Sequence, residues 1–291
     1  MIEVFFQFDF LRNALFSGIL VGIIAPMIGV FLVVKRMSLI ADALSHITLT
    51  GIAFHLLLAS FFVSLAPFDP IYMGVVFAIL GAIFIDKLRK VYEHFKELSI
   101  PIILSLGIGV GVIFISMANG FNTDLFAYLF GSIAAVGQND LLVIMVVSIF
   151  TVISLILFYK EWFFLAFDSE QAQTSGISKN WLDLIFTIIV ALVIAAAIRI
   201  VGILLISALM TLPVSAAIQW SKSFKQMFIY SIIFGELSVL IGLFLGYHLN
   251  LAPGGVIVVV GGLFLFGSIL AKKILNKYNI SFKGVKTSKA E

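Results

Sequence analysis

The sequence predicts an all-α polytopic membrane protein with eight or nine transmembrane helices. The chain has 291 residues, of which 62% are hydrophobic and only 11% are charged, more apolar than a water-soluble core of this size requires. Its apolar runs are roughly 18 to 25 residues long, the length of a membrane-spanning helix, and lack the short alternating segments of a transmembrane barrel. The absence of cysteine excludes disulfides, thiolate metal sites and cysteine nucleophiles.

Nine apolar segments follow one another along the chain, and each is expected to be a helix. They cover about residues 12–34, 39–60, 71–86, 100–118, 138–160, 181–198, 200–218, 227–247 and 254–271. The sixth and seventh are divided only by residues 199–202, and Pro213 shortens the seventh, so the prediction is nine spans with eight as the alternative. Residues 118–138 are too polar at their start to span, and they predict an outer loop with a re-entrant or interfacial helix.

Both ends of the chain are expected to lie outside the hydrocarbon. Residues 1–11 are acidic and amphipathic without the basic region of a signal peptide, which predicts an interfacial helix leading into the first span. Residues 272–291 are basic and predict a solvated cytoplasmic tail without a fold of its own. Residues 1–291 therefore form a single transmembrane domain, with no soluble part large enough for an enzyme.

The distribution of Lys and Arg predicts the orientation. Of the 18 Lys and Arg residues, 16 fall in the connections and tail at 35–36, 86–98, 160–180, 219–226 and 272–291. Because basic residues concentrate on the cytoplasmic side of a membrane protein, the N-terminus is expected outside and the C-terminus inside. The net charge of +3 is modest and does not indicate binding of nucleic acid.

Asp42 and His46 stand one step inside the second segment, four residues apart. On a helix this spacing places both side chains on one face, about 6 Å apart at Cβ. A carboxylate and an imidazole suit Mn²⁺, Fe²⁺ or Zn²⁺ better than Ca²⁺ or Mg²⁺, and the pair also suits a proton relay. Intramembrane ionisable residues are functional by default. The alternative, equally compatible with the spacing, is that Asp42 caps a helix while His46 bonds a backbone carbonyl.

Four further ionisable residues, which lie within or at the ends of the apolar segments, each have a functional or a structural explanation. Glu236 is a second buried acid and a candidate for lining a transport pathway, or else it pairs with a polar group of a neighbouring helix. His55 lies about 180° around the helix from His46, which favours a packing role. Arg199 and His248 lie near outer span ends, where snorkelling to the interface explains them.

Residues 167–177, with the sequence FDSEQAQTSGI, predict a short polar helix in the longest cytoplasmic connection. Asp168 or Ser169 can cap its start, Glu170 falls in the first turn and Gly176 can end it. Such a helix suits docking of a partner protein, and an amphipathic linker is the alternative.

Several motifs are missing. The chain has no phosphate-binding loop of the form GxxxxGK[ST], which argues against binding ATP in the usual way. It also lacks HExxH, GxSxG, a potassium-type selectivity filter and an arginine-rich voltage helix, so enzyme and channel functions lose support.

The stretch around Asp42 and His46 resembles a known family signature. RMSLIADALSH at 36–46, followed by GIA at 51–53, is similar to RMSLIGDALSHAVLPGIA, which marks the membrane permeases of manganese, zinc and iron ABC importers. Residues 167–177 resemble FDPEFARALGL, residues 201–213 resemble VGVLLVSALLLIP, and residues 249–256 resemble LDLPSGAT. The resemblance extends over about residues 12–272.

The resemblance implies a type II ABC importer permease in the bacterial plasma membrane. Two copies would enclose a central path, with two ATP-binding subunits below and an extracellular metal-binding lipoprotein above. This chain would hold no cofactor of its own: a divalent metal ion passes through, and ATP binds in the partner. Asp42 and His46 match positions that contact the metal, and the segment coupled to the ATPase includes Phe167, Asp168, Glu170, Ala172 and Gly176.

Departures from the signature leave the metal open. Ala41 replaces a glycine, while Thr48 and Thr50 replace an apolar residue and a proline before Gly51. The threonines can add oxygen ligands, which makes Thr50 a candidate pathway residue, or can bond back to their own helix. Asn250 and Ala252 are further departures, in the last element.

Two other classes of function remain as alternatives. One is a stand-alone secondary transporter or channel that uses Asp42 and His46 as an ion or proton relay. The other is a structural or receptor subunit of a membrane complex.

Overall fold

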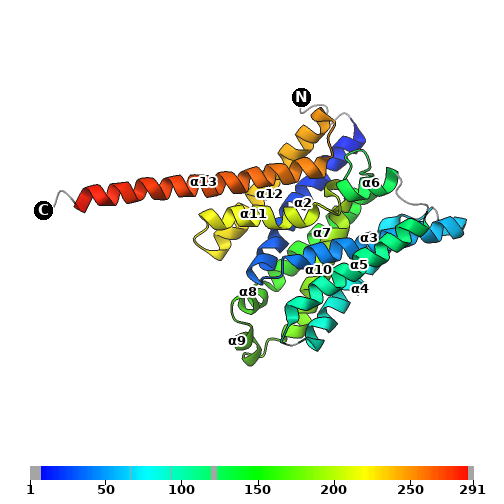
Figure 1. The fold of residues 1–291 in the computed structure, drawn as a ribbon, viewed down its shortest axis with the longest axis horizontal. Helices are drawn as coiled ribbons and strands as arrows, with labels where there is room; N and C mark the ends of the chain where they lie inside the picture. The colour runs from blue at the N-terminus through cyan, green and yellow to red at the C-terminus, as the bar shows by residue number, and fades with distance from the viewer. Residues whose placement is uncertain (1–7, 66, 93, 119–122, 288–291) are drawn as a thin grey trace.

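The computed structural model describes residues 8–65, 67–92, 94–118 and 123–287, and these residues form helices and their connections without a strand. The elements are α2 (Asp9–Val34), α3 (Leu39–Phe61), η1 (Val63–Leu65), α4 (Pro70–Val91), η2 (Lys96–Leu98), α5 (Ser99–Met117), α6 (Thr123–Phe130), α7 (Gln138–Leu157), α8 (Tyr159–Phe167), α9 (Ser169–Thr174), α10 (Lys179–Val201), α11 (Ile206–Trp220), α12 (Phe224–Leu249) and α13 (Pro253–Thr287). The long helices pack into one bundle, from which α13 projects (Figure 1). The predicted all-α membrane fold is confirmed.

In the described part of the chain, eight helices are long and apolar enough to cross a membrane: α2, α3, α4, α5, α7, α10, α12 and α13. The seventh expected span is different. Its helix, α11, has 15 residues, about 22 Å at 1.5 Å per residue and shorter than the roughly 30 Å hydrocarbon core. The count of nine full-length spans is therefore corrected to eight plus one short helix.

The shortening of α11 comes from the chain before it, and Pro213 lies inside the helix without ending it. The backbone leaves α10 at Gly202, which has a φ of +88°. The next two amides turn to α6: Ile203 N–H donates to the Tyr128 carbonyl at 2.9 Å, and Leu204 N–H donates to that of Leu129 at 3.3 Å. Residues 203 and 204 thus bond to a neighbouring helix and do not extend α11.

Two expectations about the chain ends are corrected. Residues 1–7 of the expected interfacial helix 1–11 lie outside the described residues, but residues 9–11 belong to α2, the first membrane helix. The tail from residue 272 was expected to have no fold, whereas α13 continues as a helix to Thr287. A helix already formed in the membrane extends readily, because each added residue contributes one further hydrogen bond to an existing nucleus.

Polar contacts and close packing show which helix ends lie together at each end of the bundle. Asp183, near the start of α10, bonds Lys35 at the end of α2, and Arg199, near the end of α10, bonds Asp69 before α4. A β-carbon at Gly254, near the start of α13, would lie 1.8 Å from the carbonyl of Val201 in α10. We call the end with Lys35 and α9 the α9 end, and the end with Arg199 and α6 the α6 end.

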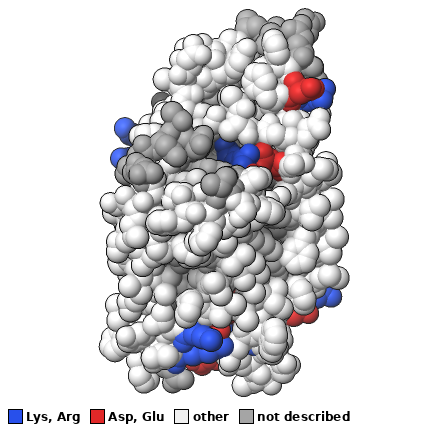
Figure 2. All heavy atoms as spheres, turned by 90° about the vertical axis from the view of Figure 1, so that its right-hand side faces the viewer, with Lys and Arg blue, Asp and Glu red and all other residues white. Residues whose placement is uncertain are grey.

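α10 is the most buried of the candidate spans. It packs against α2, α3, α4 and α7, and α3 in turn packs against α4 and α5. The surface at the right of Figure 1, where α6 lies, is mostly uncharged, with charged side chains gathered in a few small clusters (Figure 2).

Candidate functional site

Asp42 and His46 lie on one face of α3, both half-buried. The residue before α3 is Ser38, so Asp42 lies one turn inside the helix and does not cap it. Among the described residues, neither side chain makes a hydrogen bond or an ion pair. The structural alternative of a cap and a carbonyl bond is therefore not what the structure shows, and both side chains are available to a ligand.

The pair lies toward the α9 end of its helix. With α3 starting at Leu39, a rise of 1.5 Å per residue places Asp42 about 5 Å and His46 about 10 Å along it. The carboxylate oxygen and imidazole nitrogen are ligands for Mn²⁺, Fe²⁺ or Zn²⁺. Within the described residues, no group of three or more His, Asp or Glu side chains is arranged to hold a metal ion. The pair by itself does not complete a metal site, and its contact with a metal stays a prediction.

Thr50 lies one turn beyond His46 and is buried. Its hydroxyl lies 2.7 Å from the Gly107 carbonyl of α5 and 3.0 Å from the His46 carbonyl. A β-carbon at Gly111 would lie 2.9 Å from the same hydroxyl oxygen. These contacts hold α3 against α5, which is a packing role, and pathway lining by Thr50 stays a prediction.

Glu236 belongs to α12 and faces α2. Among the described residues it does not form a metal-binding group with Asp42 and His46. Its Oε2 atom is buried and has no hydrogen-bond partner in the described chain. A β-carbon at Gly22 of α2 would lie 2.5 Å from this oxygen, so the glycine leaves room for the carboxylate. Lining of the pathway by Glu236 also stays a prediction.

The predicted helix at 167–177 is present as α9, with the predicted ends. Asp168 is its N-cap, and its Oδ1 accepts from the Gln171 amide at 2.9 Å. Gly176 ends it with a φ of +86°. Phe167, Asp168 and Glu170 are exposed. Ala172, by contrast, is fully buried, so it seats α9 on the bundle and leaves contact with a partner to the exposed residues.

A further short helix, α8, fixes the position of α9 and was not predicted. Its Trp162 is fully buried and donates from Nε1 to the Leu182 carbonyl of α10 at 3.1 Å. The indole meets the ring of Phe31 in α2 edge-on, with centroids 6.1 Å apart. α9 is joined to α10 by Lys179 Nζ, which donates to Ser169 Oγ at 3.1 Å. The exposed residues Phe167, Asp168 and Glu170 therefore stand on a helix that is held in place by α8 and α10.

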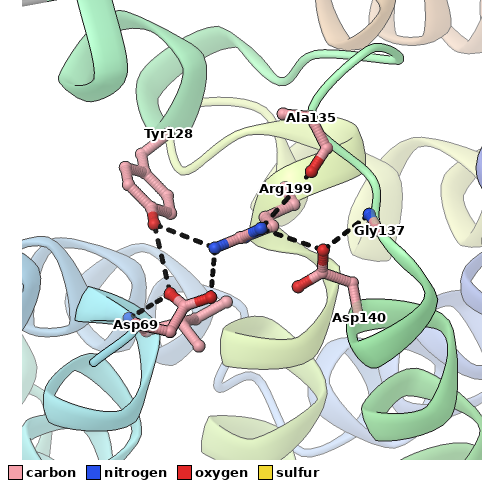
Figure 3. A network of polar contacts seen from close by, with 7 residues as sticks. Asp69, Tyr128, Ala135, Gly137, Asp140 and Arg199 are labelled. Carbon is pink, nitrogen blue, oxygen red and sulfur yellow. Dashed lines mark hydrogen bonds and ion pairs between the residues drawn. The ribbon is translucent and has the colours of Figure 1, made fainter. Parts of the chain in front are cut away.

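Arg199 corrects the expectation that snorkelling explains it. Its side chain is only 19% exposed and bonds to the carboxylates of Asp69 and Asp140 (Figure 3), the latter with Nη1 2.9 Å from Oδ2. Nη2 also donates to Tyr128 Oη at 3.2 Å. Four elements meet here: the loop before α4, α6, α7 and α10. The partners of Arg199 lie far apart in the chain, so no local sequence pattern predicts that they come together. Only the position of Asp69 could be predicted, because an Asp directly before a Pro is a typical start of a helix.

Tyr128 takes part in this network as a neutral phenol. Burial raises the pKa of Tyr128 to about 12, although the Arg199 charge opposes the shift. The phenol therefore keeps its proton and donates to Asp69 Oδ1 at 3.3 Å. A cavity of about 470 Å³ opens beside the network, lined by Asp69, Asn139, Asp140, Arg199 and several apolar residues.

Two further histidines, His55 and His248, lie where their positions in the sequence predict. His55 is 5% exposed, consistent with packing. His248 is exposed at the end of α12, and its Nδ1 lies 2.9 Å from the Phe244 carbonyl.

The bundle, with eight helices long and apolar enough to cross a membrane in the described part of the chain, defines a multi-pass membrane protein. The chain belongs to the ABC 3 transport family, whose sequence pattern matches residues 7–272. This confirms the resemblance found in the sequence.

Two relatives and one solved structure are similar to this chain over nearly its full length. The manganese import system permease protein ScaB of Streptococcus gordonii is 33% identical over 94% of this chain and 97% of its own length. The manganese transport system membrane protein MntC of Listeria monocytogenes is 31% identical over 92% of this chain and 93% of its own. PsaBC from Streptococcus pneumoniae, solved in complex with Fab, has a TM-score of 0.78 and 32% identity, covering 92% of this chain and 95% of that one.

Proposed function

We propose that this chain is the membrane-spanning subunit of an ATP-driven importer for a divalent transition metal, with Mn²⁺ as the first candidate. The observation that carries the proposal is the pair of Asp42 and His46, both half-buried on one face of α3. In the part of the chain that the structure describes, neither side chain makes a hydrogen bond or an ion pair. The named functions of ScaB and MntC support manganese. Zn²⁺ and Fe²⁺ accept the same two ligand types.

The metal would be bound between two copies of the chain. Each copy supplies one carboxylate and one imidazole, which together make a four-ligand set. The metal is cargo, so its binding must be loose enough to allow release. Since a metal-bound imidazole must be neutral and a carboxylate ionised, binding competes with protons.

The two ends of the bundle would receive different partners. The exposed Phe167 and Glu170 at the α9 end are placed to dock ATP-binding subunits, which hold the ATP. The α6 end would face outward and receive metal from a binding lipoprotein. This orientation, with the N-terminus outside and the C-terminus inside, follows the Lys and Arg distribution, and ATP-driven switching of the dimer gives alternating access.

The test is metal uptake into proteoliposomes that contain the permease, the ATP-binding subunits and the binding lipoprotein. Mn²⁺ uptake should require ATP, with Zn²⁺ and Fe²⁺ as competitors. Asp42→Asn and His46→Gln should each lower uptake by at least about tenfold, while His248→Gln, at an exposed histidine of α12, should not change it.

Two results would reject the proposal. Uptake that continues without the ATP-binding subunits would favour the stand-alone transporter. Normal uptake by correctly assembled Asp42→Asn and His46→Gln variants would remove these residues from the metal site and favour a structural or receptor subunit.

A further inference from the structure

Lys35 and Asp183 form a buried ion pair at the α9 end of the bundle. Nζ lies 2.6 Å from Oδ1, and the two side chains are only 6% and 10% exposed. The ammonium also lies 4.8 Å from the centre of the Phe186 ring, one turn further along α10. The pair joins segments 148 residues apart in sequence, and the proposed metal site does not use it.

On one side, the pair holds the turn that leads into the metal-bearing helix. Lys35 is the C-cap of α2, and Arg36 follows with a φ of +57°. The turn is closed by two hydrogen bonds, from Arg36 N–H to Val33 O at 3.0 Å and from Met37 N–H to Leu32 O at 2.8 Å. Since α3 begins at Leu39, a displacement of Lys35 is passed directly to the turn that carries Asp42.

On the other side, the pair is joined to α8 and α9. Asp183 lies in the second turn of α10, next to Leu182, whose carbonyl accepts from Trp162 of α8 at 3.1 Å. Lys179, one turn earlier, bonds Ser169 of α9. A movement of α8 and α9 therefore reaches the first two turns of α10, where Asp183 lies, through hydrogen bonds to Leu182 and Lys179.

An ion pair in this setting resists separation. In a low-dielectric interior the attraction between the two charges is strong and little screened, and pulling them apart would leave each one buried without compensation. The start of α10 and the α2–α3 turn are consequently bound to move together, while apolar contacts alone would let them slide.

We propose that Lys35 and Asp183 are a positioning pair that transmits the movement of α8 and α9 to the helix that holds the metal. The pair touches neither metal nor nucleotide. It acts by keeping α3 in step with α10 when the ATP-binding subunits move α9. This inference rests on the proposed function, because it assigns a coupling role within the same importer.

The experiment compares the number of metal ions imported per ATP hydrolysed, in the reconstituted complex described above. In the double variant Lys35→Met/Asp183→Leu, the ion pair is replaced by apolar contact. We expect assembly, Mn²⁺ binding and ATP hydrolysis to persist while ions imported per ATP fall about tenfold, and the swapped pair Lys35→Asp/Asp183→Lys should recover most of the loss. Lys90→Met is the matched control, since it breaks the half-exposed Lys90–Asp86 pair at the same end.

A merely structural role would lower the amount of assembled complex and leave ions per ATP unchanged, and that result would overturn the inference. So would a swapped pair that assembles and stays as uncoupled as the apolar pair. If the apolar pair does not assemble, Lys35→Gln decides, because it keeps a hydrogen-bond donor for Asp183 without the charge: a wild-type ratio would reject the pair's role, and a reduced ratio would support it. Failure of the wild-type complex to import Mn²⁺ with ATP would instead reject the proposed function.

Discussion

The guanidinium of Arg199 lies 2.9 Å from the carboxylate of Asp140, although 59 residues separate them. The same guanidinium bonds Asp69, which is 130 residues away. One cation thus joins two carboxylates at the α6 end, where α4 and α7 start and α10 ends. With Lys35 and Asp183 at the opposite end, α10 carries a buried ionic contact near each of its termini.

Replacing Arg199 should destabilise the protein strongly. In Arg199→Leu two partly buried carboxylates lose their shared partner, which should lower the free energy of unfolding by about 3 kcal/mol. The check is thermal unfolding in detergent. Arg12→Leu is the matched control, because its pair with Asp9 is 41% and 74% exposed on the two sides and should contribute less than about 1 kcal/mol. Equal effects of the two substitutions would contradict the role of the network.

A close approach of two backbones makes Gly29 intolerant of any side chain. A β-carbon there would lie 1.9 Å from the Met210 carbonyl oxygen, forcing α2 and α11 apart. Gly29→Ala should lower the free energy of unfolding by about 3 kcal/mol or abolish folding. Gly109→Ala, with nothing within 4 Å of its new β-carbon, should be neutral or stabilising by up to about 1 kcal/mol. Expression and thermal unfolding of both variants are the measurements.

Thr50 allows packing and pathway roles to be separated. Thr50→Val keeps the shape but loses the hydroxyl that donates to Gly107, so the free energy of unfolding should fall by about 1 kcal/mol. A role of the hydroxyl in packing alone predicts that uptake per assembled complex stays within about twofold of wild type. Thr50→Ser keeps the hydroxyl and serves as control. Loss of uptake in the valine variant alone would make Thr50 a pathway ligand.

Glu170 should matter for association with the ATP-binding subunit. It is exposed in the first turn of α9, on the support formed by Trp162 and Lys179. Glu170→Lys should weaken the complex by about tenfold, a typical effect of truncating or reversing a charge at an interface. The measurement is the dissociation constant in detergent. Asp9→Lys, an exposed acid at the start of α2, is the control, and unaltered assembly of Glu170→Lys would contradict docking at α9.

Local patterns in the sequence predicted much of the fold and part of the site. The capped helix α9 could be predicted because Asp168 and the Gln171 amide are three residues apart. The shared face of Asp42 and His46 follows from the helical repeat alone. Arg199 was misjudged as a snorkelling residue because nothing in the sequence near it indicates that Asp69 and Asp140 would be its neighbours.

The sequence by itself determined the membrane class, the long helices and the family, because hydrophobic length and short motifs are properties of contiguous residues. Only the tertiary structure decided that α11 is short, that α8 supports α9, and that the two ends of α10 are held by ion pairs. These features depend on groups far apart in the chain that meet when the helices pack. Burial then gives such contacts their strength, since a charge removed from water needs the partner that the fold brings to it.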